Sequence, residues 1–190
     1  MAETVRLEVD KSCSEEDEAD MVQAAQHSLA SFKQLYLKWL SPVYRYFYFR
    51  ICNVKDSEDL TSQVFLKVYE ELPRYRDNGR FSAWLFTIVR NKAFDYFRAG
   101  ATEVSLETID PADGTYDLLT QAVHSDEIQR LQILIRSLPE EDQELIRLRF
   151  IAGLGYREMG AVLHRKEDAV RKSISRLLAR LQSQLETNHE

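Results

Sequence analysis

The chain has 190 residues, 44% of them hydrophobic and 29% charged, which is ordinary for a globular protein and fits one domain or two small ones. With only 6 Gly and 4 Pro, the composition favours helices over a turn-rich β architecture. The apolar runs are too short to span a bilayer, the N-terminus lacks a signal-peptide pattern, and Cys13 and Cys52 stand alone, which argues against a disulfide framework or a zinc site. We therefore expect a cytoplasmic protein.

The net charge of −6 is distributed unevenly along the chain. Residues 1–30 and 101–127 carry net charges of −6 and −7, whereas residues 31–100 and 128–190 carry +5 and +2. Non-specific DNA affinity comes from neutralising phosphates, so a chain with this balance would bind DNA weakly by itself. If it binds DNA, we expect a partner to bring it there.

The first basic block predicts several helices. Apolar residues recur at helical spacing from Phe32, and Ser41-Pro42 is expected to interrupt this run before Val43. A second helix is predicted over 57–72, with Ser57 as its N-cap. Pro73 ends that helix, the polar loop 74–80 follows, and another helix extends from near Ser82 to near Gly100.

The acidic segment 102–124 contains Pro111 and Gly114 and is interpreted as a linker with little fixed structure. Helical periodicity resumes at Ile128, and Gly153 and Gly155 break it. The predicted elements after the linker are a helix start at Pro139, a short helix over 156–163, a turn over 164–166 and a longer amphipathic helix over 167–185. The predicted class is all-α, in two small helical domains joined by a flexible acidic linker.

No motif in the sequence predicts catalysis, a metal or a cofactor. The four histidines are scattered, and the chain has neither a metal-binding HExxH motif nor a glycine-rich phosphate loop. We expect a protein that is not an enzyme.

The C-terminal block has the parts of a helix-turn-helix, in which the second helix enters the major groove of DNA. Val170, Ile174, Leu177, Leu178 and Leu181 are expected on the buried side of this helix. The basic residues expected to reach DNA are Arg165, Lys166, Arg171, Lys172 and Arg176. Such patterns also arise by chance in helical proteins, so this block alone leaves DNA binding open.

Three segments carry a more specific signal. They are Asp56–Tyr69 (DSEDLTSQVFLKVY), Phe81–Arg98 (FSAWLFTIVRNKAFDYFR) and Leu138–Phe150 (LPEEDQELIRLRF). In sequence, order and spacing they resemble signatures of bacterial RNA polymerase sigma factors, over roughly residues 19–185. Because only two domains are present, the chain is similar to the extracytoplasmic-function (ECF) group of the sigma-70 family.

The resemblance implies a domain order. Residues 1–18 would be an acidic tail, 19–100 the region 2 domain, 101–127 an acidic linker and 128–190 the region 4 helix-turn-helix domain. Region 2 would bind core polymerase and the minus-ten promoter element, and region 4 the minus-thirty-five element.

The resemblance also implies partners. The helix over 57–72 would dock on the clamp helices of the polymerase β′ subunit, and the β flap would be a further contact. The outward residues for the dock are Asp59, Gln63, Leu66, Lys67 and Glu70, which could otherwise be a plain solvated face. An anti-sigma factor is a further possible partner, and it could hold the protein near the membrane, with no insertion into it.

For the minus-ten element, separated strands would be held by stacking on aromatic rings and by a basic track, with an extruded base read in a pocket. Trp84 has two interpretations, as a core residue or as a strand-separating wedge. The residues implied are Tyr75, Arg76, Asp77, Asn78, Arg80, Trp84, Arg90, Asn91 and Arg98.

Three departures and two alternatives qualify the resemblance. His27-Ser28 replaces a common Gly-Asp turn, which affects a loop. Lys166 and Asp168 stand where the family usually has Ser and Gly, so the bound sequence cannot be inferred. The alternatives are an autonomous helix-turn-helix regulator, which would bind duplex DNA by itself, and a helical scaffold. The promoter motifs of the first block argue against a scaffold.

Overall fold

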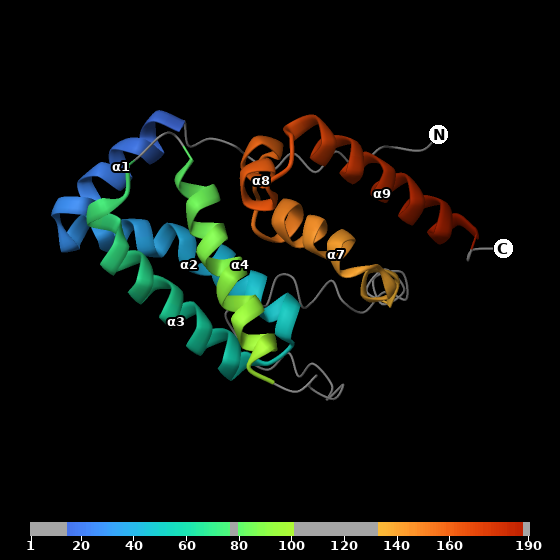
Figure 1. Ribbon diagram of the computed structural model, residues 1–190, viewed down its shortest axis with the longest axis horizontal. Helices are drawn as coiled ribbons and strands as arrows, with labels where there is room; N and C mark the ends of the chain where they lie inside the picture. The colour runs from blue at the N-terminus through green and yellow to red at the C-terminus, as the bar shows by residue number, and fades with distance from the viewer. Residues whose placement is uncertain (1–14, 77–79, 101–132, 188–190) are drawn as a thin grey trace.

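The computed structural model describes residues 15–76, 80–100 and 133–187, with side chains from residue 18 to residue 185. Every regular element in these ranges is helical, which confirms the predicted class (Figure 1). The predicted linker lies outside the described residues, and the predicted tail overlaps them only where the first helix begins. None of the described helices is long and apolar enough to span a membrane.

Four helices form the first domain (Figure 1), and their buried apolar side chains belong to one core cluster that continues into the second domain. Their bounds are Glu15–His27 for α1, Leu29–Ile51 for α2, Val54–Glu71 for α3 and Phe81–Arg98 for α4, with a 3₁₀ turn, η1, at Leu72–Arg74. Each large apolar side chain in such a core contributes about 1.5–3 kcal/mol by leaving water. Fully buried members of the core are Leu35, Val43, Tyr46, Phe47, Val64, Phe81, Leu85, Phe86 and Val89.

Helix α2 is continuous and contains Pro42 in its interior, so the predicted interruption at Ser41-Pro42 is wrong. A proline inside a helix removes one backbone hydrogen bond and crowds the preceding turn, at a cost of about 3 kcal/mol. The turns on either side bury Trp39 and Val43 in the core, and this burial offsets the cost.

Helix α3 begins one turn earlier than predicted. Its N-cap is Asn53, whose side-chain oxygen accepts from the backbone N–H of Asp56 at 3.0 Å. Ser57, the predicted cap, lies fully buried inside the helix and donates to the Asn53 carbonyl at 2.6 Å. The turn that precedes the helix passes through Cys52, which has a left-handed φ of 58°.

The second domain contains a helical stretch at 133–137, then α7 (Glu140–Ile146), η2 (Arg147–Ile151), α8 (Tyr156–Leu163) and α9 (Glu167–Thr187). The predicted helix start after Pro139 and the predicted bounds of α8 are confirmed. The turn η2 is widened, with the Ala152 N–H donating to the Arg147 carbonyl at 2.9 Å.

Helices α8 and α9 form the predicted helix-turn-helix, and a glycine allows the turn to close. The Arg165 N–H donates to the Gly160 carbonyl at 2.9 Å. A Cβ at Gly160 would lie 2.7 Å from the Arg165 carbonyl oxygen, closer than real Cβ atoms approach. His164 takes the left-handed conformation at the end of α8, with φ 53°. Any larger residue at position 160 would therefore push α9 away from α8.

The two domains are in direct contact. Helix α4 packs on α8, and α2 packs on η2 (Figure 1). The helix predicted to recognise the minus-ten element thus lies against the first helix of the helix-turn-helix.

Candidate nucleic-acid interface

The start of the loop after η1 is built on aromatic packing. The ring of Tyr75 lies 4.6 Å from that of Trp84 and 5.7 Å from that of Phe81. Phe81 is fully buried, whereas Tyr75 and Trp84 are half-buried. Trp84 therefore lies at the margin of the core, where part of its surface remains accessible.

Gln26 of α1 holds this loop from the other side. Its side-chain Nε2 donates to the carbonyl oxygens of Leu72 at 3.0 Å and of Tyr75 at 2.6 Å. One amide thus fixes both ends of the turn that leads into the predicted pocket. Gln26 could not be predicted from the sequence, because a contact with backbone atoms 49 positions away leaves no local pattern.

The other predicted minus-ten residues divide into three groups. Arg76, Arg80, Asn91 and Arg98 are exposed, and Arg98 forms an exposed pair with Asp95 at 2.8 Å. Asp77 and Asn78 lie outside the described residues. Arg90 differs from both groups, because it faces the second domain.

The recognition helix α9 presents a basic face. Val170, Ile174, Leu177 and Leu181 are buried as predicted, but Leu178 is 44% exposed, because it lies on the outward side of the helix. The predicted basic residues are all exposed: Arg165, Lys166, Arg171, Lys172 and Arg176.

Two of these basic side chains are held by neighbours. Arg171 pairs with Glu167 at 2.6 Å, and Arg165 donates to the Ser173 hydroxyl at 2.7 Å. Among the described residues no ion pair engages Lys172 or Arg176. These two side chains can therefore approach a phosphate or a base without first breaking a salt bridge.

The predicted polymerase dock on α3 is an exposed strip. Asp59, Gln63, Leu66 and Glu70 are exposed, and Lys67 is partly exposed. Leu66 is 61% exposed, although it is a large apolar side chain. Gln63 accepts from Lys92 of α4 at 3.3 Å, so α4 also contributes to the rim of the strip. A single exposed leucine is ordinary on a protein surface, so the assignment of this strip to polymerase stays a prediction.

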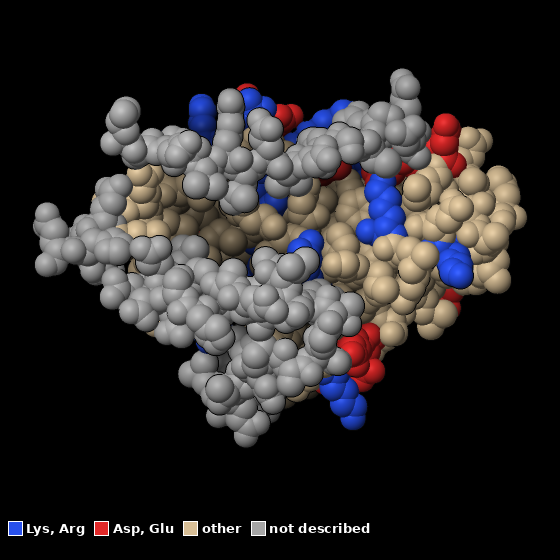
Figure 2. Space-filling model, turned by 180° about the vertical axis from the view of Figure 1, so that it is seen from behind, with Lys and Arg blue, Asp and Glu red and all other residues tan. Residues whose placement is uncertain are grey.

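The face in Figure 2 shows basic side chains standing apart from one another on the part drawn in colour, with acidic side chains beside some of them. On that visible surface they do not merge into one broad basic patch. The coloured part of this face therefore offers no continuous basic track for a phosphate backbone.

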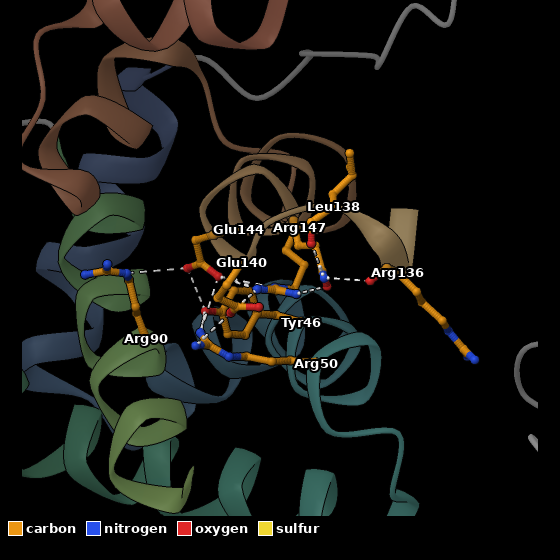
Figure 3. Close-up of polar contacts among 9 residues, drawn as sticks. Tyr46, Arg50, Arg90, Arg136, Leu138, Glu140, Glu144 and Arg147 are labelled. Carbon is orange, nitrogen blue, oxygen red and sulfur yellow. Dashed lines mark hydrogen bonds and ion pairs between the residues drawn. The ribbon is translucent and has the colours of Figure 1, made fainter. Parts of the chain in front are cut away.

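An ionic cluster joins the two domains, and we call it the Glu144 cluster (Figure 3). Its centre is buried, whereas the Glu140 side chain is 57% exposed. The Glu144 carboxylate accepts from the Tyr46 hydroxyl at 2.8 Å and from Arg50 Nη1 at 3.3 Å. It lies 3.5 Å from Arg90 Nε and 3.1 Å from Arg147 Nη2. The cluster has six members: Tyr46, Arg50, Arg90, Glu140, Glu144 and Arg147.

Burial and charge shift the pKa values within this cluster. Burial, with the Glu144 carboxylate beside it, raises the pKa of the Tyr46 hydroxyl far above its usual value. Burial acts to lower the pKa of Arg50, but Tyr46, Glu144 and Glu140 together raise it above its usual value. Tyr46 therefore stays a neutral donor and Arg50 stays charged.

No sequence pattern predicts a role for Tyr46, Arg50 or Glu144, and Arg90 is predicted to contact DNA. From the sequence, Glu144 is expected to be an exposed acid, like the other acidic residues at the start of that helix. Only the packing of the two domains reveals it as buried.

Comparison with known proteins gives a consistent result. Residues 35–102 match the Sigma-70 region 2 family, and residues 128–181 match the Sigma-70, region 4 family. The ECF RNA polymerase sigma factor BldN of Streptomyces coelicolor is 30% identical over 176 residues, which cover 85% of this chain but 64% of BldN. The ECF RNA polymerase sigma factor ShbA of Streptomyces griseus is 36% identical over 133 residues, which cover 66% of this chain and 70% of ShbA.

Two solved structures share the fold. CnrH, in complex with the cytosolic domain of CnrY, matches 90% of this chain and 97% of its own, with a TM-score of 0.65 and 23% identity. The sigma factor RpoE of Bartonella quintana, in complex with the anti-sigma factor NepR, matches 83% of this chain and 98% of its own, with a TM-score of 0.64 and 22% identity.

Proposed function

Because this chain belongs to the ECF group of the sigma-70 family, the factors that give core RNA polymerase its promoter specificity, we propose that its two domains divide promoter recognition between them. Residues 19–100 act on the minus-ten element and residues 128–190 on the minus-thirty-five element. Residues 1–18 and 101–127 are the tail and the connecting linker. The chain contributes no catalytic group, because the polymerase performs the chemistry.

In the first domain, bases of the minus-ten element stack on Tyr75 and Trp84, and the loop that follows Arg76 reads the base sequence. The aromatic packing and the Gln26 bonds support this, because they hold the start of the loop in one conformation before DNA arrives. A preorganised loop loses less conformational entropy on binding. The exposed Arg80 and Arg98 are suited to phosphates.

In the second domain α9 enters the major groove of duplex DNA. The observation that supports this assignment is the exposed basic face of the helix. Lys172 and Arg176 are one turn apart and have no salt-bridge partner among the described residues. An arginine that contacts a guanine with two hydrogen bonds discriminates by about 1–3 kcal/mol against the wrong base. A phosphate contact adds affinity for any sequence.

The strip on α3 docks on the β′ clamp helices, with Leu66 as the apolar centre and Asp59 and Glu70 as the acidic rim. The second domain contacts the β flap. Since CnrH is found with CnrY and RpoE with the anti-sigma factor NepR, we also propose an anti-sigma partner for this chain. Because the protein would act on RNA polymerase, we propose that it is cytoplasmic.

The test is run-off transcription by core polymerase on genomic fragments, with and without this protein, followed by sequencing of the transcript ends. The proposal expects new start sites that share upstream motifs. Identical transcripts in both reactions would contradict it. Tight duplex binding by the isolated protein would instead favour an autonomous regulator.

Two variants serve as controls in the same assay. Arg171→Ala, Lys172→Ala and Arg176→Ala combined should abolish the new start sites while leaving binding to core polymerase unchanged. Asp59→Lys with Glu70→Lys should weaken polymerase binding itself. Together they separate promoter reading from docking.

A further inference from the structure

The basic residues assigned to the minus-thirty-five element are not held equally. Arg171 is fixed by two contacts, whereas Lys172 and Arg176 have no ion pair among the described residues. Recognition helices of this kind contact base edges through their N-terminal residues. Arg171 is the first basic residue of α9, so it lies in the part of the helix that meets the bases.

The first contact is with the ring of Tyr156, the first residue of α8. The central carbon of the Arg171 guanidinium lies 5.3 Å from the centroid of this ring, and α8 packs beside α9 (Figure 1). A guanidinium within about 6 Å of an aromatic ring is attracted by the negative face of the ring. The contact therefore joins a side chain of the first helix of the helix-turn-helix to one of the second.

The second contact is an ion pair within α9. Arg171 Nη2 lies 2.6 Å from a carboxylate oxygen of Glu167, one turn earlier on the same helix. The guanidinium has several N–H donors in a rigid planar fork, so this pair leaves donors for a base. Glu167 also lies in the first turn of α9, where the helix dipole favours an acid.

Tyr156 is itself held in place. Arg149 lies 4.6 Å from the centroid of the same ring, and its Nη1 donates to the Leu154 carbonyl at 2.8 Å. At the start of α8 the Glu158 carboxylate accepts from the Gly155 N–H, which caps the helix. The Tyr156 ring is half-buried and packs against the core. It therefore supports Arg171 in one position before DNA binds.

We propose that Tyr156 and Glu167 are positioning residues, which orient Arg171 to read one G·C base pair of the minus-thirty-five element. This inference rests on the proposed function and names the residues that set base selection within that site. Guanine presents two acceptors to the major groove, and an arginine that bonds to both must hold its guanidinium plane in one orientation. Lys172 is a compact charge on a flexible stem, which suits a phosphate instead.

The test uses this protein bound to core polymerase, on a promoter found by run-off transcription. Each base pair of the minus-thirty-five element is changed in turn, and fluorescence anisotropy measures the affinity of the complex for each duplex. Discrimination at a position is the ratio of the affinity for the original base pair to that for its substitute. A residue that only stabilises the fold changes the affinity for every sequence alike, so it leaves these ratios unchanged.

Arg171→Ala should abolish discrimination at one G·C position. Tyr156→Leu should lower discrimination at the same position by about two- to fivefold, because it removes the attraction of the ring. Tyr156→Phe keeps the ring and should retain the wild-type ratio. Lys172→Ala should weaken binding to all sequences without altering the ratios.

Glu167→Ala removes the second contact without disturbing the core, because the Glu167 side chain is 42% exposed. It should lower discrimination at the Arg171 position by up to about fivefold. The matched control is Asp168→Ala, which removes the same charge from an exposed neighbour that has no ion pair among the described residues. Both variants should raise the affinity for every duplex, because each removes an acid near the phosphates, but only Glu167→Ala should change a ratio.

Unchanged ratios in both Tyr156→Leu and Glu167→Ala would overturn the proposal. So would an equal loss of discrimination in Tyr156→Phe and Tyr156→Leu, since the hydroxyl rather than the ring would then matter. Circular dichroism checks that all variants keep their helix content.

A measurement without DNA separates this proposal from the proposed function. In the free protein, the Arg171 side-chain proton resonances should be displaced by the ring in the wild type and in Tyr156→Phe, but not in Tyr156→Leu. Resonances that are the same in all three proteins would overturn the positioning role. A wild-type complex that discriminates at no base pair of the element would instead contradict the proposed function, and with it the role of Arg171.

Discussion

The core of the first domain is held by apolar packing alone, whereas the contact between the two domains combines apolar packing with the ion pairs of the Glu144 cluster. Phe86 is fully buried, and its ring lies 6.0 Å from Trp39 and 5.9 Å from Tyr46. Tyr46 is shared by both regions, because its ring packs in the core while its hydroxyl reaches Glu144. Apolar burial is non-directional, whereas an ionic contact depends on the geometry of its hydrogen bonds.

This difference indicates which part of the molecule can move in function. An apolar core that opened would expose its surface to water at about 25 cal/mol per Å². An ionic contact that opens returns its charges to water, which solvates them well. The domains are therefore expected to persist as units while the contact between them forms and breaks.

The largest expected effect is in the core. Phe86→Ala should cost about 3–5 kcal/mol of unfolding free energy, because it leaves a cavity among the aromatic rings. Urea unfolding followed by circular dichroism measures it, with Glu141→Gln as the surface control. A loss of unfolding free energy below about 1 kcal/mol would contradict this contrast, because the core would then tolerate substitution as well as the contact between the domains does.

Gln26→Leu should have an intermediate effect. It removes two hydrogen bonds and leaves the Leu72 and Tyr75 carbonyls without that donor, at a cost of about 1–3 kcal/mol. Because Gln26 positions the loop, promoter selection should also change at one base of the minus-ten element. Start-site sequencing measures this. A loss of stability with unaltered base preference would mean that Gln26 is only structural, and Gln26→Glu, which can donate only when protonated, is the matched variant.

The smallest effect is expected at Tyr96, whose hydroxyl donates to Asp56 at 2.6 Å inside the first domain. Burial and the hydrogen bond to Asp56 raise the pKa of Tyr96 to about 12. The folded state thus holds this proton more tightly than the unfolded chain, in which tyrosine titrates near 10. The stabilisation is complete below pH 10 and is lost as the pH rises toward 12.

Tyr96→Phe should therefore cost about 0.5–1.5 kcal/mol at pH 7. It should also flatten the fall in stability between pH 10 and pH 12. Thermal melts of the two proteins across this range test the prediction. If stability falls with pH in parallel for the wild type and Tyr96→Phe, the Tyr96–Asp56 hydrogen bond does not contribute to stability. A change in the separation of the two domains would show that the effect of the bond is not confined to the first domain.

The sequence predicts the features whose causes are local. Pro139 before an acidic turn, the glycines at 153 and 155 and the apolar spacing of α9 each act within a few residues, and the corresponding elements are confirmed. The same local reasoning failed at Pro42, because tertiary packing outweighed the propensity of one residue. At Ser57 it chose a good cap while a better-placed one, Asn53, lay one turn earlier.

The interdomain contact could not be predicted, because its partners are distant in sequence and ordinary in type. Glu144 belongs to an acidic helix start that suggests solvent exposure, and Arg50 is an isolated basic residue at the end of an aromatic-rich helix. Arg90 lies in a motif that suggests DNA. Their roles depend on how two separately patterned domains meet. The apolar periodicity of a single helix does not predict how the two domains pack against each other.

The most direct test of the account is the separation of the domains in the free and the working states. Spin labels on the native Cys52 and on Glu141→Cys, in a Cys13→Ser background, lie close to the Arg50–Glu140 pair when the two domains are in contact. The account predicts a short, narrow distance distribution in the free protein. With core polymerase and promoter DNA it predicts a shift to distances longer by on the order of tens of ångströms, because the two elements are far apart on the duplex. An unchanged distance in a complex that initiates transcription would contradict it.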